Sequence, residues 1–193
     1  MTITTPQHDH EAAAAAAARF SQHADPDISF AVLDLPIGRV VAATTSDGLV
    51  RIAYEDLNGS VEEIVQQLAD RLSPRVLEQP ARLDPVAREL DEYFAGKRTT
   101  FDLKLDWALI RGRFGAKVLK ATAAIPYGGV STYGEIAAKA GNPAASRATG
   151  NALGSNPIPV IIPCHRVLRS GGGLGGYTGG VERKQALLAL EKG

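Results

Sequence analysis

The sequence predicts two unlike domains: an α/β unit over residues 26–106 and a mainly helical unit with a helix-turn-helix over residues 107–193. Three observations support this division. Extended apolar segments separated by glycine turns fill most of the first part, short capped helices fill the second, and the net charge changes sign between them. Ahead of both, residues 1–25 contain an alanine run and three histidines, and we expect them to form a disordered or helical leader.

In the first part, strands are expected to precede helices. Apolar residues occur in short extended runs between turns, and later recur at helical spacing. The predicted elements are strands at residues 28–35, 39–45 and 49–54, a helix from residue 61 capped by residues 58–60, a helix at 85–94 and a strand at 99–105. Beyond the leader this part has no histidine and no cysteine, and its carboxylates are scattered as on a solvated surface. We therefore interpret it as a scaffold.

The second part begins with a linker at residues 107–113. Residues 132–135 have the spacing of a capping box, and Asn142 followed by Pro143 is a typical helix start. The predicted helices cover residues 114–124, 132 to a stop at Gly141, 142–154 and 181–192. The two middle helices, joined by a glycine turn, form a helix-turn-helix candidate, although many helical hairpins share this pattern.

The helix at residues 142–154 carries small side chains and a single charge, Arg147. A helix that reads bases in the wide major groove usually carries several long polar side chains. Small residues instead permit close approach to a minor groove, into which one arginine can insert. The same small residues would also suit a tight contact with another helix, so both interpretations stay open on composition alone.

Opposite charges on the two parts cancel in the whole chain. Residues 1–106 carry 10 Lys and Arg against 18 Asp and Glu, whereas residues 107–193 carry 11 against 3. A basic part favours binding of a polyanion such as nucleic acid. It would equally suit docking on the acidic part, and charge alone does not separate these alternatives.

Cys164 is the only cysteine, and its neighbour His165 is the only histidine outside the leader. An apolar run at residues 158–162 leads to them, as a buried strand would, and Pro163 ends that run. A thiol beside an imidazole can be an activated nucleophile, but a lone cysteine is often simply a small buried apolar residue. Because neighbouring side chains of a strand face opposite ways, the pair can cooperate only if the chain turns here or a water connects them.

A base of this kind needs an acid to orient its ring. The basic part offers Glu135, Glu182 and Glu191, and the sequence does not choose among them. Further along, residues 171–180 are rich in glycine but lack the ending and the frame of a nucleotide-binding P-loop. We expect this segment to be a loop whose backbone amides line a pocket beside the thiol.

Composition excludes several classes of protein. A single cysteine rules out an internal disulfide and any zinc site built on two or more thiolates. No run of about 18 apolar residues could span a membrane, and the leader lacks the basic region of a signal peptide. We therefore expect a cytoplasmic protein that uses no metal and no cofactor.

Motifs along residues 114–193 together resemble the O6-alkylguanine-DNA alkyltransferases, or methylated-DNA–protein-cysteine methyltransferases. They are Pro-Cys-His-Arg-Val at 163–167, Asn-Pro at 156–157, Gly-Tyr-Thr-Gly-Gly at 176–180, Ile-Pro-Tyr-Gly at 125–128, Ser-Thr-Tyr at 131–133, Gly-Asn-Pro at 141–143, Arg-Ala-Thr-Gly at 147–150, and Leu-Leu at 187–188 before Glu191. The first domain matches more weakly, through residues 35–38 and 47–49. The resemblance implies a small ribonuclease-H-like sheet with helices in that domain.

The resemblance also implies a suicide repair reaction. O6-alkylguanine, and O4-alkylthymine as a further substrate, would flip out of double-stranded DNA and pass its alkyl group irreversibly to Cys164. His165 would be the base, acting through a water, and Glu191 would orient it. Tyr133 would donate a proton or hydrogen bond to the leaving base, and Asn156 would tie the DNA-binding helix to the active-site turn.

The remaining implied residues contact DNA or the flipped base. Arg147 would enter the duplex through the minor groove and fill the vacated space. The implied DNA contacts are Arg147, Ala145, Ser146 and Gly150, and the implied pocket residues are Val167, Tyr177, Thr178 and Leu153. We expect a monomer with access to chromosomal DNA, and the sequence leaves cooperative binding along DNA open.

Two other classes of function are alternatives to repair. A lesion-sensing relative that binds damaged guanine without repairing it lacks the cysteine, so Cys164 argues against that class. A thiol hydrolase or peroxidatic enzyme would leave the basic part and Arg147 without a purpose. Gly115 and Leu119 depart from the Gln and Trp that family members often carry, which bears on packing rather than on chemistry.

Overall fold

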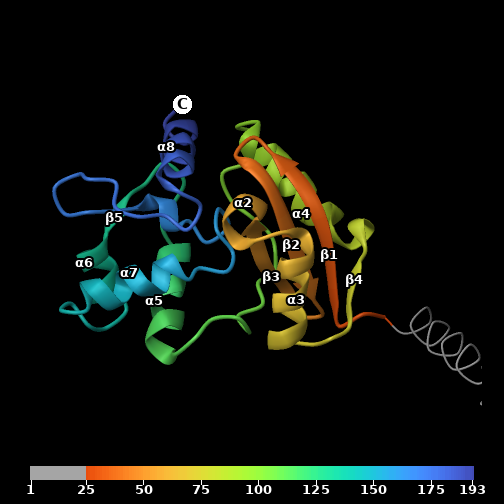
Figure 1. The fold of residues 1–193 in the computed structure, drawn as a ribbon. Helices are drawn as coiled ribbons and strands as arrows, with labels where there is room; N and C mark the ends of the chain where they lie inside the picture. Colours follow the sequence, from red (N-terminus) through yellow and green to blue (C-terminus); the bar gives the residue numbers. More distant parts are fainter. Residues whose placement is uncertain (1–24) are drawn as a thin grey trace, which may run out of the picture.

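The computed structural model describes residues 25–193, so the predicted leader lies outside the described residues except for its last position. Figure 1 shows a sheet with helices beside a helical part, which ends at the C-terminus. The sheet contains β1 (Ile28–Leu35), β2 (Gly38–Thr45), β3 (Gly48–Tyr54) and β4 (Val76–Glu78), in the order β3-β2-β1-β4. The three longer strands pair antiparallel, as their turn sequences predict, and β4 adds a short parallel edge to β1.

Three helices accompany this sheet: α2 (Glu55–Asn58), α3 (Val61–Arg71) and α4 (Pro80–Phe94). The predicted cap of α3 is confirmed, because Ser60 and Glu63 form a reciprocal capping box. However, α4 begins five residues earlier than predicted. Pro80 occupies its first position, where the missing amide costs nothing, and Pro85 lies inside the helix instead of starting it.

The strand predicted at residues 99–105 is wrong. This segment is irregular, and only Leu105 forms an isolated bridge, to Leu49 of β3. The Asp102 amide instead donates to the buried carboxylate of Glu89 at 2.9 Å. A side-chain acceptor therefore takes a backbone donor that a strand would have given to a neighbouring strand.

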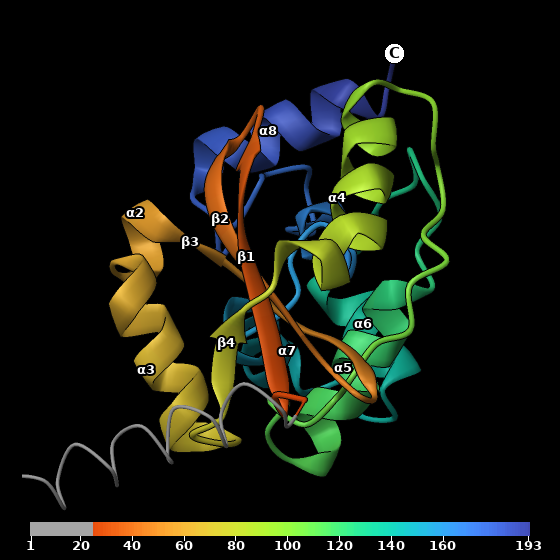
Figure 2. The same ribbon diagram turned by 90° about the vertical axis from the view of Figure 1, so that its right-hand side faces the viewer.

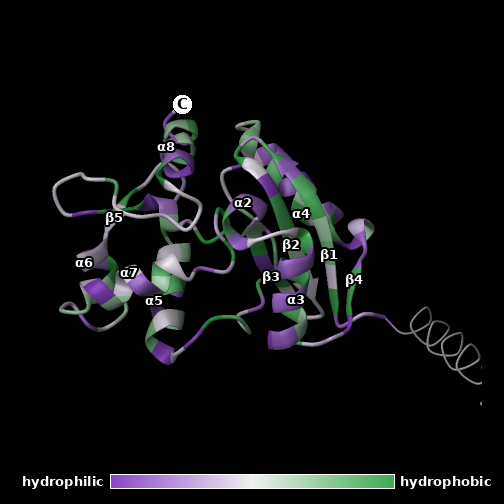
Figure 3. Ribbon diagram, viewed as in Figure 1, coloured by the Kyte–Doolittle hydropathy of each residue, from purple (hydrophilic) through white to green (hydrophobic). Residues whose placement is uncertain are grey.

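Side chains of β2 alternate between the two faces of the sheet, and both faces are buried. Val40 and Ala42 belong to the core that α4 covers, whereas Val41 and Ala43 belong to the core that α3 covers. Figure 2 shows these two helices on opposite sides of the strands, and Figure 3 shows the strands as largely hydrophobic. The core beneath α4 continues into the helical part and includes Cys164, so the two parts of the molecule share one core.

The helical part contains α5 (Arg113–Ala123), α6 (Tyr133–Lys139), α7 (Ser146–Gly154) and α8 (Val181–Leu190). It also has a 3₁₀ turn, η1 (Cys164–Arg166), and a two-residue parallel pair of β5 (Ser131–Thr132) with β6 (Val167–Leu168). All four predicted helices exist, but the N-cap of α7 is Ala145 and not the predicted Asn142, three residues later in the chain. The Ala145 amide donates to the Asn142 carbonyl at 3.0 Å, which closes a turn where the helix was expected to begin.

Both interpretations of the small residues in α7 have a structural counterpart. One face of the helix packs on its neighbours: a Cβ added at Gly150 would lie 3.8 Å from Tyr133 of α6, and Thr149 and Leu153 are buried. Arg147, Ala148 and Asn151 lie on the opposite face and are exposed, as is Ser146 at the first position of the helix. Helix packing at ordinary van der Waals distance is therefore present, and it leaves the arginine exposed to a partner.

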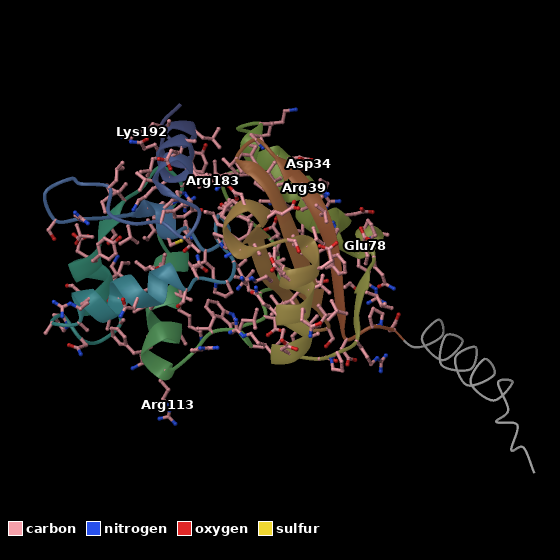
Figure 4. The ribbon with its side chains drawn as sticks, viewed as in Figure 1. Asp34, Arg39, Glu78, Arg113, Arg183 and Lys192 are labelled. Atoms are coloured by element: carbon pink, nitrogen blue, oxygen red, sulfur yellow. The ribbon has the colours of Figure 1, made fainter. Side chains whose placement is uncertain are left out.

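Docking between opposite charges accounts for little of the contact between the two parts. Within residues 25–193, one salt bridge joins them, from Arg183 of α8 to Asp56 at 2.8 Å. Arg183 also lies 4.5 Å from the centre of the Tyr54 ring, and Figure 4 places it at the junction. Most basic side chains of the helical part thus remain available to a polyanion. No helix in the described part of the chain is long and apolar enough to cross a membrane.

Candidate active site around Cys164

The apolar run before Cys164 is a buried loop and not the expected strand. Pro159 and Ile162 form a short bridge across it, and Val160 adopts a positive φ of 75°, which is rare for a β-branched residue. The Asn156 side chain holds the loop closed from inside. Its Oδ1 accepts from the Ile158 amide at 3.1 Å and its Nδ2 donates to the Ile162 carbonyl at 2.8 Å.

The chain turns at Cys164, as Pro163 indicated, because residues 164–166 form η1. Cys164 is 4% exposed, and its Sγ lies 3.1 Å from the Asn156 Nδ2. Burial raises the pKa of the Cys164 thiol, and hydrogen bonds from Asn156 and Thr178 work against that shift. The thiol is therefore protonated at neutral pH and needs a base before it can act as a nucleophile.

His165 has the features of that base. Its side chain is fully buried, and its Nε2 lies 2.9 Å from the Oε1 of Glu191. Burial lowers the pKa of His165, so the ring is neutral at neutral pH and can accept a proton. The other nitrogen, Nδ1, has no hydrogen-bond partner among the described residues.

Of the three acids considered for orienting His165, only Glu191 touches the ring. Glu135 instead completes the capping box of α6 with Thr132, and Glu182 is exposed in the first turn of α8. Glu191 reaches His165 because it lies at the C-cap of α8, directly after the last residue of that helix, where it is buried at 6% exposure. Sequence spacing could not reveal this contact, which joins residues 26 positions apart.

Glu191 is the centre of a buried network. Arg166 donates to both carboxylate oxygens, from Nε at 2.9 Å and from Nη2 at 2.7 Å, and the Gly128 amide donates at 3.2 Å. Burial alone would raise the pKa of Glu191, but the hydrogen bonds from His165, Arg166 and Tyr93 lower it to about 2. Glu191 is therefore ionised throughout the neutral range. Arg166 thus forms a buried ion pair within its own part of the molecule.

Two tyrosines of the sheet part contact residues of this site. The sequence had indicated that the sheet part is only a scaffold, so these contacts were not predicted. Tyr93 of α4 donates its hydroxyl to Glu191 at 2.6 Å, and the Tyr54 hydroxyl lies 3.2 Å from that of Tyr177. Both tyrosines are fully buried. In the sequence they occupy ordinary apolar positions of a helix and a strand, so no signal distinguished them from core residues.

A pocket of about 630 Å³ opens in front of the thiol. Its walls come from the start of α6, the exposed face of α7 and the glycine-rich loop. The lining includes Cys164, Tyr133, Ser146, Arg147, Gly150, Leu153, Tyr177 and Thr178, together with Arg169, which the sequence did not single out. Ala145 and Val167 do not line it, and the Val167 carbonyl accepts a hydrogen bond from Lys184 at 2.6 Å.

Lys184 holds the glycine-rich loop from beneath. It is fully buried, and its Nζ donates to the carbonyls of Val167, Leu174 and Gly176. Burial lowers the pKa of Lys184 to about 8, and these three acceptors favour its charged form at neutral pH. The Lys184 ammonium is therefore used inside the protein and does not face a partner. The loop itself is confirmed as a wall of the pocket beside the thiol.

The fold and the site together define a class of protein: a two-part molecule with a buried cysteine next to a buried His–Glu pair, and a pocket at the cysteine lined by a helix. Family models match both parts. Residues 28–107 match the 6-O-methylguanine DNA methyltransferase, ribonuclease-like domain, and residues 113–193 match the DNA binding domain of the same family.

Individual relatives agree with these matches. A methylated-DNA–protein-cysteine methyltransferase of Mycolicibacterium paratuberculosis is 39% identical over 166 residues, which cover 86% of this chain and 93% of the relative. The crystal structure of the O6-methylguanine methyltransferase of Mycobacterium tuberculosis is 38% identical, with a TM-score of 0.72 over 86% of this chain and 93% of that one. A structure of the same organism's protein in complex with DNA is 39% identical, with a TM-score of 0.72 over 85% and 92%.

The chain belongs to the 6-O-methylguanine DNA methyltransferase family. The predicted family, its two-part architecture and the enzyme class, a methylated-DNA–protein-cysteine methyltransferase that serves DNA repair, are thereby confirmed. Its C-terminal part is a DNA-binding domain.

Proposed function

We propose that Cys164 is the residue that takes the alkyl group, from O6-alkylguanine and also from O4-alkylthymine flipped out of double-stranded DNA. The observation that carries this proposal is the position of the thiol in a pocket whose wall includes the exposed face of α7. A base within a duplex could not reach the thiol of a cysteine residue that is 4% exposed, so it must leave the stack to react.

The proposed chemistry is one displacement with internal proton transfer. His165 takes the thiol proton at Nδ1 through a water, and Glu191 stabilises the resulting imidazolium. The thiolate sulfur then forms a bond to the alkyl carbon, the bond from that carbon to O6 breaks, and its electron pair passes to the base. Tyr133 donates a hydrogen bond or proton to the leaving base; burial raises the pKa of its hydroxyl, which keeps it protonated.

The remaining residues position DNA and the flipped base. Arg147 enters through the minor groove, and Ala145, Ser146 and Gly150 let the backbone of α7 approach the duplex closely. Leu153, Tyr177, Thr178 and the backbone of Val167 receive the base. In this proposal α6 and α7 act as the helix-turn-helix of a domain spanning residues 107–193, carried by a scaffold spanning 26–106. The protein acts as a monomer in the cytoplasm, with access to chromosomal DNA.

One experiment tests the proposal directly. The protein is incubated with a duplex that carries a single O6-methylguanine, and its peptides are analysed by mass spectrometry. We expect one methyl group per protein, on the peptide containing Cys164, and unmodified guanine in the DNA. Cys164→Ala should bind the duplex and repair nothing. Methylation elsewhere, or survival of the lesion with wild-type protein in excess, would refute the assignment.

Replacing Arg147 by Ala tests whether this residue acts in binding and opening duplex DNA and not in the alkyl transfer itself. Arg147 is exposed on the rim of the pocket, and within the described residues it makes no salt bridge. We expect Arg147→Ala to slow repair of duplex DNA by about 10- to 100-fold, which corresponds to about 1–3 kcal/mol. Reaction with free O6-benzylguanine, which needs no flipping, should stay unchanged.

The matched control is Arg88→Ala, since Arg88 is an exposed arginine of α4 in the other part of the molecule. It should affect neither substrate. If Arg147→Ala slowed the reaction with duplex DNA and with the free base equally, its role in opening the duplex would be wrong.

A further inference from the structure

A second, separate cavity lies at the junction of the two parts. It has a volume of about 290 Å³, near the lower end of the range of about 300–1,000 Å³ that is usual for small-molecule sites. Its walls come from β3, the end of α3, the segment before α5, and the loop that follows α7. This cavity shares Gly154 and Thr178 with the pocket in front of Cys164, and their other lining residues differ.

Three arginines line this cavity: Arg51 of β3, Arg71 of α3 and Arg111 before α5. None of the described lining residues carries a carboxylate. Arg51 is half-buried and forms no salt bridge within residues 25–193, and burial together with the charge of Arg71 lowers the pKa of Arg51. Arg71 and Arg111 are exposed, and Arg71 also donates to the Leu109 carbonyl at 3.3 Å. Their charges and that of Arg51 repel one another where they face the same cavity, and an anion bound there would relieve this repulsion.

Besides the arginines, uncharged N–H groups at the cavity can donate hydrogen bonds to an anion. The first hydrogen bond of α5 runs from the Ala116 amide to the Gly112 carbonyl, so the amides of residues 113–115 have no acceptor inside the helix. No side chain caps this end, and of residues 113–115 only Gly115 lines the cavity, together with Leu119 one turn further along α5. The Asn58 Oδ1 accepts from the Tyr54 amide, which leaves its NH₂ group as a further donor at the wall.

We propose that this cavity is a binding site for a phosphate-type oxyanion, either a free ion or a backbone phosphate of DNA. Guanidinium groups and the positive end of a helix are the donors that proteins use for such anions. The bound anion would hold Arg51 and Arg71 of the sheet part to Arg111 and α5 of the helical part. Asn156, which bonds the Cys164 thiol, also lines the cavity, so the anion would stiffen the support of the reactive loop. The proposal does not depend on alkyl transfer.

The test uses the full chain and inorganic phosphate. Melting temperature is measured against phosphate concentration and compared with sodium chloride at equal ionic strength. We expect a saturable rise of about 2–5 °C with phosphate. Arg51→Gln should abolish the rise, whereas Arg88→Gln, a change at an exposed arginine away from the cavity, should keep it. In case Arg51→Gln folds poorly, NMR of the wild-type protein should show phosphate shifting the amides of Gly115 and Ser155.

Equal stabilisation of wild-type protein and Arg51→Gln, or an effect of phosphate no larger than that of chloride, would overturn the proposal. So would the absence of phosphate-induced shifts at Gly115 and Ser155. A second arm identifies the source of the anion with an unmodified duplex. For a DNA phosphate, Arg51→Gln lowers the slope of log affinity against log salt by about one, and phosphate competes with the duplex. For a free ion, Arg51→Gln binds the duplex as the wild type does while losing its response to phosphate.

Discussion

Glu191→Gln is expected to slow alkyl transfer by about 10²- to 10⁴-fold, the range over which a positioned acid–base group contributes. The carboxylate accepts from His165, Arg166, Tyr93 and the Gly128 amide. An amide in its place carries no charge to stabilise the imidazolium. It also offers one acceptor where the carboxylate offers two, so Arg166 and His165 compete for it.

The same substitution should lower the free energy of unfolding by about 3–5 kcal/mol, because the buried Arg166 guanidinium loses its counter-charge. Rates are measured with O6-methylguanine duplex, and stability by urea unfolding. Glu182→Gln is the matched control, since Glu182 is an exposed glutamate on the same helix. Similar rates and stabilities for the two variants would show that the network around Glu191 carries neither effect.

The pH dependence of the free energy of unfolding should report on the same network around Glu191. The folded-state pKa of Glu191 is about 2, below its usual value of 4.5. The stability that its ionised form contributes is therefore complete above about pH 4.5 and is lost as the pH falls towards 2. In Glu191→Gln the loss of stability between these pH values should be smaller than in the wild type. Equal pH dependence in the two proteins would contradict the lowered pKa.

Asn156→Ala is expected to lower the free energy of unfolding by about 2–5 kcal/mol. It leaves the Ile158 amide without a partner inside the protein, and a buried orphan of this kind costs about 1–3 kcal/mol. It also removes one of the two hydrogen bonds of the Ile162 carbonyl, which still accepts from the Cys164 amide at 2.8 Å. The loop also contains the strained residue Val160, which depends on its surroundings to keep its conformation. Loss of the side chain should therefore loosen the loop as a whole.

Reactivity should fall with stability in this variant. The Asn156 Nδ2 lies 3.1 Å from the Cys164 Sγ, where it stabilises the thiolate and helps to fix the position of the sulfur. We expect alkyl transfer to slow by about 10- to 100-fold, both with duplex DNA and with free O6-benzylguanine. Asn142→Ala, at an exposed asparagine before α7, is the control and should change neither property. A variant that lost activity only with duplex DNA would place Asn156 in DNA binding instead.

Much of the fold follows from local sequence. The first three strands, α3 and the four helices of the second part were predicted because periodicity, turn residues and capping boxes are local signals. The two wrong strand predictions fall where a side chain takes over backbone hydrogen bonds. Residues 99–105 are irregular because Glu89 accepts from Asp102, and residues 158–162 form a loop because Asn156 satisfies their backbone from inside.

The candidate site divides in the same way. A lone Cys beside a lone His, a small-residue helix with one arginine, and family motifs indicated the nucleophile, its base and the DNA partner from the sequence. Residue spacing left open which acid orients His165; the family resemblance implied Glu191, and the structure shows that contact. That Tyr93 and Tyr54 reach the site from the other part, and that Arg51, Arg71 and Arg111 share a cavity, was decided by tertiary structure alone. The physical reason is that such contacts join residues far apart in the chain, and packing of the shared core brings them together.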